Sequence, residues 1–194
     1  MIALIDYGAG NLKSVANALD DLEVEYIISN KNEEINLADK IIFPGVGEAK
    51  SAMNKLNDYS IVESIVSTSK PLLGICLGMQ LLATFSEERN TKCLDVIQTV
   101  VKKFDSEEVK VPHMGWNKVE YKNQNELFKN IKSGEHFYFA NSYYVPTTEY
   151  TIASTQYGIS FSSALNKNNF YGVQFHPEKS GKVGLQVLRN FIEL

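Results

Sequence analysis

The first half of the chain alternates short apolar runs with stretches of helical periodicity, and this alternation constrains the fold more than any other feature. Apolar runs at 2–5, 24–28, 41–43 and 72–75 predict buried strands, and residues 12–22, 49–56 and 61–66 predict helices. Strands that are separated by helices pair in parallel, because the helix supplies the crossover. The sequence therefore predicts an α/β fold with a mostly parallel central sheet and helices on both faces.

The second half has a different texture, with β-like segments rich in Val, Tyr and Phe at 96–104, 109–111, 118–121, 137–145, 151–157, 159–165 and 170–175. We expect these segments to form β-hairpins attached to an edge of the central sheet. A last amphipathic helix, with Ser180 as its expected N-cap, is predicted by Val183, Val187, Leu188, Phe191 and Ile192. Because no linker, repeat or low-complexity segment interrupts the pattern, residues 1–194 are expected to form one domain.

Composition and charge exclude several function classes. Of the 194 residues, 44% are hydrophobic and 22% charged, which is ordinary for a globular protein. A net charge of −4 with scattered lysines argues against a nucleic-acid surface. No signal peptide or membrane-spanning run is evident, and two cysteines are too few for a disulfide framework. We expect a cytoplasmic protein with no nucleic-acid or membrane partner.

The strongest local signal is the pentapeptide Gly74-Ile75-Cys76-Leu77-Gly78, which lies between an apolar strand and a helix-forming run. This is the cysteine version of the nucleophile elbow, a tight turn in which the flanking glycines leave room for the nucleophile. The helix N-terminus favours negative charge and so supports a thiolate. Although an arbitrary cysteine is more often a small core residue, this setting favours a nucleophile at Cys76, whereas Cys93 lacks it.

A thiolate nucleophile needs a base, and the base needs a group that orients it. His176 follows a β-like run, and Glu178 lies two residues later, which in extended backbone places both side chains on the same side. Pro177 stiffens the segment and ends ladder pairing. His113 and His136 have no comparable partner. Since no C-x-x-C or H-E-x-x-H spacing occurs, a metal site is not expected.

A third element is the loop Pro44-Gly45-Val46-Gly47 after the strand at 41–43. Its glycines allow backbone N–H groups to be exposed, so the loop could supply one oxyanion donor while Leu77 N–H supplies the other. By itself this loop is a weak signal, because strand-to-helix turns in any α/β protein use glycine.

With these residues in place, the chain resembles the class I (triad-type) glutamine amidotransferases. The resemblance rests on P-G-V-G at 44–47, G-I-C-L-G-M-Q at 74–80 and V-Q-F-H-P-E at 173–178, in that order, and covers residue 2 to the C-terminal helix. It implies a flavodoxin-like fold with added β-hairpins. It also implies that Cys76 attacks the glutamine side-chain amide, that His176 passes the proton to leaving ammonia, and that the γ-glutamyl thioester is then hydrolysed to glutamate. No cofactor is implied.

Three further segments, at 6–12, 112–117 and 176–180, resemble the glutaminase subunits of imidazole glycerol phosphate synthase. This resemblance implies a heterodimer with a HisF-type (β/α)8-barrel subunit, to which the ammonia from L-glutamine is channelled. The expected products are imidazole glycerol phosphate and the aminoimidazole carboxamide ribonucleotide, made in histidine biosynthesis.

The resemblance also assigns site residues. The oxyanion hole would be formed by Leu77, Gly45 and Val46, and glutamine would be held by Gln80, Glu88, Asn141, Ser142 and Tyr143. The partner interface would include Asn11, Trp116, Tyr138 and Lys179, although core packing explains the two aromatic residues equally well. The chain departs from the family in having Asn141 where histidine is usual, Arg89-Asn90 after Glu88 where glycine is usual, and no glycine-rich stretch at 93–96. These departures put glutamine affinity and partner coupling in question.

Three alternatives remain at this level. A related paralogue could deliver ammonia to a different synthase, such as a sugar-aminating enzyme of surface-glycan biosynthesis. The glycines at 6–10 could belong to a nucleotide-binding module, but the third glycine of G-x-G-x-x-G is missing. A cysteine peptidase would share the elbow, but Gln80 and His-Pro-Glu favour the amidotransferase.

Overall fold

The central sheet is parallel where the chain begins. The computed structural model describes residues 1–8, 11–121 and 123–194. Five parallel strands lie in the order β2 (Tyr26–Ser29), β1 (Ile2–Ile5), β3 (Lys40–Phe43), β4 (Leu72–Ile75) and β13 (Phe170–Val173). The predicted strand at 72–75 has the observed bounds. Ala9 and Gly10, part of the turn expected after the first strand, lie outside the described residues.

The second half of the chain extends the same sheet beyond β13. The added strands follow in the order β12 (Ile159–Lys167), β10 (Tyr143–Pro146), β7 (Ile97–Lys103), β5 (Ala83–Ser86) and β6 (Thr91–Lys92), and β11 (Thr151–Tyr157) pairs with β12. All of these pairings are antiparallel except that of β5 with β7. One hairpin, β8 (His113–Val119) with β9 (Glu135–Asn141), forms a separate two-stranded sheet. The α/β fold with a largely parallel centre and added hairpins is confirmed.

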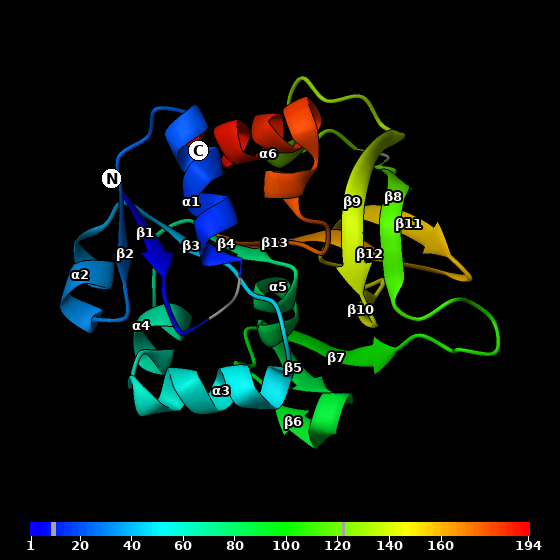
Figure 1. Ribbon diagram of the computed structural model, residues 1–194, viewed down its shortest axis with the longest axis horizontal. Helices are drawn as coiled ribbons and strands as arrows, with labels where there is room; N and C mark the ends of the chain where they lie inside the picture. The colour runs from blue at the N-terminus through cyan, green and yellow to red at the C-terminus, as the bar shows by residue number, and fades with distance from the viewer. Residues whose placement is uncertain (9–10, 122) are drawn as a thin grey trace.

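Helices cover both faces of the parallel strands. In Figure 1, α1 (Leu12–Asp21) and α6 (Gly181–Glu193) lie on one side, and α3 (Ala49–Asp58) and α4 (Val62–Val66) lie on the other. The remaining helices are α2 (Asn32–Leu37) and α5 (Leu77–Leu81), with 3-10 turns η1 (Glu88–Asn90), η2 (Glu126–Phe128) and η3 (Pro177–Lys179). No helix in the described part of the chain is long and apolar enough to cross a membrane.

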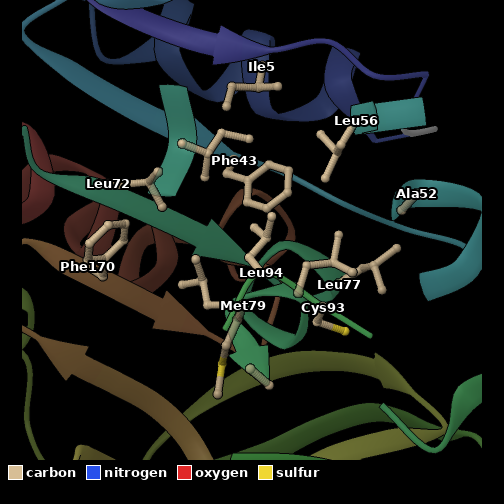
Figure 2. Close-up of a cluster of buried hydrophobic side chains, with 14 of the residues drawn as sticks. Ile5, Phe43, Ala52, Leu56, Leu72, Leu77, Met79, Cys93, Leu94 and Phe170 are labelled. Carbon is tan, nitrogen blue, oxygen red and sulfur yellow. The ribbon is translucent and has the colours of Figure 1, made fainter. Parts of the chain in front are cut away.

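The core consists of two layers, because successive strand residues point to opposite faces. Ile41 and Phe43 of β3 belong to the layer under α3 and α4, whereas Ile42 belongs to the layer under α1 and α6. Figure 2 shows the first layer, in which Phe43 and Leu72 pack with Leu77 and Met79 from the elbow helix. The elbow is therefore anchored in a dry core through the residues that follow the nucleophile.

Three local expectations were wrong. Residues 109–111 form no strand but turns and irregular backbone that lead into β8, and the stretch at 137–145 is broken at Ser142 into β9 and β10. Ser180 precedes α6 but makes no side-chain capping bond. Its hydroxyl instead donates to His176 O at 2.6 Å and accepts from Tyr138 N–H at 3.0 Å. Ser180 therefore stabilises the turn before the helix, and not the helix itself.

Candidate active site

The nucleophile elbow is as tight as the sequence predicts. Cys76 joins β4 to α5 with φ 53° and ψ −106°, a strained conformation for a residue with a side chain. Its N–H donates to Val173 O at 2.8 Å on the neighbouring strand. A Cβ on Gly78 would overlap the Phe43 carbonyl oxygen, and one on Gly74 would lie 2.8 Å from the Gly78 backbone. Only glycine fits on either side of Cys76.

The side chains of His176 and Glu178 are in contact as predicted, but the backbone between them differs from the prediction. The backbone after His176 forms the 3-10 turn η3 and not an extended strand. His176 Nδ1 nevertheless lies 2.8 Å from Glu178 Oε1, with the two side chains 1% and 0% exposed. The turn is held by a bond from His176 N–H to Tyr138 O at 2.9 Å. This geometry can orient an imidazole whose other nitrogen serves a nucleophile.

Electrostatics favour a charged imidazole at this position. Burial lowers the pKa of His176, but the charge and hydrogen bonding of a Cys76 thiolate and of Glu178 outweigh it and raise the pKa to about 10. Both partners interact more strongly with the protonated ring than with the neutral one, because they are anions that accept hydrogen bonds. The site therefore favours a thiolate–imidazolium pair when Cys76 is deprotonated.

Asn11, which the resemblance placed at the partner interface, contacts the candidate catalytic residue Glu178 of its own chain. Its side chain is buried, with 4% exposed, and its Nδ2 donates to Glu178 Oε1 at 3.1 Å. Glu178 Oε1 thus accepts from both His176 and Asn11, so the carboxylate is held by the residue that precedes α1, 167 positions earlier in the chain. No sequence pattern predicts this contact, because the two residues lie in distant segments of the chain.

The expected oxyanion hole is closed in this conformation. Leu77 N–H donates to Gly45 O at 3.2 Å, so the carbonyl of the Gly45–Val46 peptide, and not its N–H, faces the elbow. The preceding carbonyl, Pro44 O, accepts from the Tyr7 hydroxyl at 2.8 Å. Burial, together with a nearby Cys76 thiolate, raises the pKa of Tyr7, which keeps it a neutral donor. Opening the hole requires rotation of the Gly45–Val46 peptide, while the bond from Tyr7 keeps the preceding carbonyl, Pro44 O, in place.

A cavity of about 150 Å³ gathers all five predicted substrate-binding residues around Cys76. They are Gln80, Glu88, Asn141, Ser142 and Tyr143, and Val46 and Leu77 of the predicted oxyanion hole line the cavity as well. The lining also includes Gly47, Pro112 and Ala140, to which the sequence analysis had assigned no role in the site. A larger cavity, about 510 Å³, is lined by Glu120, Tyr121, residues 123–125 and part of β11, and none of the predicted site residues lines it. The smaller cavity is the candidate site, because Cys76 and the predicted substrate-binding residues line it.

Two of these cavity residues also bond to the protein around them. Glu88 Oε2 accepts from Ala49 N–H at 2.7 Å, at the start of α3, and burial raises the pKa of its carboxyl group despite that bond. Gln80 Nε2 donates to Tyr143 O and to Gln174 Oε1, each at 2.9 Å. Gln174, which the sequence analysis quoted only within a motif, is fully buried and donates to Cys76 Sγ at 3.6 Å.

The hairpin β8–β9 carries two of the other predicted interface residues, Trp116 and Tyr138, and η3 carries the third, Lys179. Trp116 is 57% exposed, which excludes core packing, and its ring lies 6.2 Å from that of the half-buried Tyr138. Met114, two residues before Trp116 on the same strand face, is 64% exposed. Lys179 is exposed in η3, directly after Glu178. Tyr138 connects this surface to the site, because its backbone bonds to both His176 and Ser180.

The remaining candidate groups lie away from this site. Cys93 is a buried free thiol among apolar side chains (Figure 2), and burial with the charge of Glu88 raises its pKa to about 12. His113 stacks between the rings of Phe139 and Tyr157. In the described ranges, no group of three or more His, Cys, Asp or Glu side chains could hold a metal ion.

Comparison with known proteins agrees with this geometry. The family model described as "Glutamine amidotransferase class-I" matches residues 3–194. The chain is 49% identical to "Imidazole glycerol phosphate synthase subunit HisH" of Bacteroides fragilis (strain YCH46), covering 100% of this chain and 99% of the relative. It is 47% identical to the protein of the same name from Mannheimia succiniciproducens, with 98% of each chain covered.

Solved structures show the same fold at low identity. A structure described as a glutamine amidotransferase has a TM-score of 0.76 at 18% identity, with 100% and 98% of the two chains covered. PurLQS from Thermotoga maritima has a TM-score of 0.71 at 16% identity, with 99% and 97% covered. The full-length family match and the identity to the HisH proteins together show that this chain is a glutamine amidotransferase of the class I family, within its HisH group.

Proposed function

We propose that the chain is the glutaminase subunit of an imidazole glycerol phosphate synthase, with Cys76, His176 and Glu178 as its catalytic residues. The observation that carries the proposal is the buried 2.8 Å contact between His176 Nδ1 and Glu178 Oε1 beside a cysteine at a glycine-flanked elbow. The proposal takes residues 1–194 as one catalytic domain, supported by the continuous sheet that joins β1 to β13.

In the proposed reaction, the Cys76 thiolate attacks the side-chain amide carbon of glutamine. The C–N bond breaks as the His176 imidazolium gives its proton to the leaving nitrogen, which departs as ammonia and leaves a γ-glutamyl thioester. His176 then removes a proton from water, which attacks the thioester carbonyl. Glutamate and the free Cys76 are the products. Glu178 keeps the imidazole in the required orientation, and Asn11 fixes Glu178.

The closed oxyanion hole supports control of this reaction by a partner. A tetrahedral intermediate needs N–H donors, but Leu77 N–H is engaged with Gly45 O. Gly45 and Gly47 flank the peptides that must rotate, and glycine makes such a rotation inexpensive. We infer that docking of a partner loaded with its acceptor shifts this loop toward the open form, so that glutamine is not hydrolysed without need.

The acceptor lies on another chain, which we take to be a HisF-type barrel subunit. HisH proteins from Bacteroides fragilis and from Pectobacterium atrosepticum match essentially the whole chain at 49% and 45% identity. This support favours the synthase subunit over the sugar-aminating alternative. The exposed Trp116 and Lys179 give the proposed docking surface. We place the complex in the cytoplasm, where the two free cysteines would stay reduced.

The catalytic roles are tested by glutamate release in the presence of the partner subunit. Cys76→Ser and His176→Ala should each lower turnover by about a thousandfold or more, and Glu178→Gln should lower it less, because it misorients the ring without removing it. Lys182→Ala, an exposed change on α6, is the matched control and should keep wild-type turnover. Near-wild-type turnover in His176→Ala would refute the assignment.

Partner control is tested separately with purified subunits. Glutamine turnover by the chain alone should be low, and a HisF-type subunit loaded with its acceptor should raise it by several orders of magnitude. Lys179→Glu should weaken this stimulation more than the basal rate, because Lys179 is exposed and lies outside the cavity. Full turnover by the chain alone, with no response to a partner, would exclude the gating mechanism.

A further inference from the structure

We propose that Gln174 is a positioning residue that donates an amide N–H to the Cys76 sulfur and thereby stabilises the nucleophile as a thiolate. The proposal rests on the function above in one respect, since it takes Cys76 as the nucleophile. Gln174 lies between the end of β13 and His176, and its side chain is 0% exposed. Its Nε2 lies 3.6 Å from Cys76 Sγ, an ordinary length for a hydrogen bond to sulfur.

The orientation of the Gln174 amide follows from its neighbours. A backbone carbonyl can only accept, so the Gln80 atom that lies 2.9 Å from Tyr143 O must be the nitrogen. The second N–H of that nitrogen points to Gln174, 2.9 Å away, so the Gln174 atom that receives it must be the oxygen. The Gln174 nitrogen is then left to face Cys76. One carbonyl thus fixes the direction of two amides.

The hydrogen bonds that orient Gln174 extend to Asn141. Asn141 Nδ2 also donates to Tyr143 O, at 2.9 Å, which fills both lone pairs of that oxygen. Asn141 and Gln80 are 5% exposed, and both line the cavity beside Cys76. Reversing the Gln174 amide would set its N–H donors against those of Gln80 and turn its oxygen toward the Cys76 sulfur, which is costly in a buried space. The donor toward sulfur is therefore held in place before any substrate binds.

This donor complements His176 and does not duplicate it. His176 gives its proton away during the reaction, whereas an amide N–H cannot, so the Gln174 donor faces the sulfur at every step. It is in place before Cys76 attacks, and again when the thioester is hydrolysed and Cys76 leaves as a thiolate. A buried hydrogen bond to a charged group is worth roughly tenfold to a hundredfold in an equilibrium, and a sulfur acceptor suggests the lower end.

The test measures the reactivity of Cys76 directly, with iodoacetamide as the probe and mass spectrometry to separate Cys76 from Cys93. Two variants remove the donor: Gln174→Met keeps the length of the side chain, and Gln174→Glu keeps an acceptor toward Gln80. Both should slow Cys76 alkylation at pH 7 by about tenfold. The deficit should shrink at pH 9, because hydroxide can form the thiolate without the donor. Glutamine kcat should fall at least as much as the alkylation rate, with a smaller change in KM.

The matched control is Asn190→Leu, which removes another buried amide, one that donates to Leu127 O and Lys129 O outside the cavity. It should leave the alkylation rate unchanged at both pH values. An unchanged rate in both Gln174 variants, or an equal deficit at pH 7 and pH 9, would overturn the proposal, because a displaced cysteine is slow at every pH. If neither Gln174 variant folds, Gln80→Met is used, because it removes the hydrogen bonds that orient the Gln174 amide. Cys76 alkylation in Gln80→Met that shows no pH-dependent slowing would equally overturn the proposal.

The two proposals fail in different ways. If the wild-type chain with its partner releases no glutamate while Gln174 variants still slow alkylation at pH 7, the glutaminase assignment is wrong and the role of Gln174 holds. If glutamate release depends on Cys76 but alkylation is indifferent to Gln174, the glutaminase assignment holds and the role of Gln174 is wrong.

Discussion

The buried histidine outside the site makes the stability of the protein depend on pH in a way that can be isolated. His113 is 4% exposed, and its ring stacks against Tyr157 at 3.9 Å and against Phe139 at 4.9 Å. Burial lowers the pKa of His113 from 6.5 to about 4. The unfolded chain therefore binds a proton at a pH where the folded chain does not, so stability falls as the pH falls through this window.

The size of the effect follows from the two pKa values. At pH 5, an unfolded histidine is almost fully protonated, whereas the folded His113 is mostly neutral. The difference amounts to about 2 kcal/mol of stability lost between pH 7.5 and pH 5, and it is complete only below about pH 4. His113→Phe removes this contribution. Any packing cost of the larger ring is present at both pH values and cancels in the comparison.

Urea unfolding at pH 7.5 and pH 5 measures the difference. The wild type should lose about 2 kcal/mol more than His113→Phe over this interval. Asn117 Nδ2 lies 3.3 Å from His113 Nε2 but also donates to Gln156 O at 3.1 Å, so it keeps a partner in the variant. His136→Phe, at an exposed position, should keep the wild-type dependence. Parallel profiles for the wild type and His113→Phe would refute the reasoning.

Two further predictions concern the site, and a third concerns Cys93. Gly184→Ala should lower kcat by about tenfold or more, because its Cβ would overlap Pro177 O and displace the turn that carries Glu178. Lys182→Ala on the same helix should leave kcat unchanged, and steady-state kinetics of the two variants measure the difference. Asn11→Leu should lower kcat severalfold with little change in KM, since it frees the Glu178 carboxylate, and an unchanged kcat would remove Asn11 from the triad's support. Cys93 should resist alkylation at pH 8 in the folded protein, because its raised pKa leaves about one thiol in 10⁴ ionised, and peptide mapping after brief iodoacetamide treatment checks this.

The parts of the fold that were predictable are those that local pattern determines. The strand at 72–75 and the tight turn after it could be predicted together, because the apolar run marks a buried strand and the glycines on either side of Cys76 mark positions with no room for a side chain. The strand at 151–157 was also predicted with its observed bounds. The strand at 83–86, by contrast, was missed, since Ala-Thr-Phe-Ser is neither a continuous apolar run nor a clean alternation. Its strand state comes from pairing with β7, not from its own sequence.

The site shows the same division. Cys76, His176 and Glu178 could be named from motifs, but the reason given for the last pair, extended backbone, was wrong, because a 3-10 turn brings them together. The buried state of Asn11 and the bond from Gln174 to Cys76 Sγ could not be found, since each depends on side chains from distant segments. The direction of the Gly45–Val46 peptide is also invisible in sequence, because glycine permits both directions at similar cost.

In the proposed mechanism the nucleophile and its base are already positioned, whereas the Leu77 N–H that would serve the oxyanion is bonded to Gly45 O. This difference indicates that partner control would act on the oxyanion hole. Buried hydrogen bonds fix His176, Glu178 and Asn11, so displacing these side chains would require disruption of the packing around them. Removing one oxyanion donor costs an enzyme about 10²–10³ in rate, which is enough to suppress idle turnover. Closing the hole requires only that one peptide turn its carbonyl toward Leu77 N–H. Because the backbone of Tyr138 bonds to His176 and its ring faces Trp116 on the exposed hairpin, a partner docked there would contact the segment that carries the base. On the proposed function, the chain would stay folded and nearly inactive until a partner covers that surface.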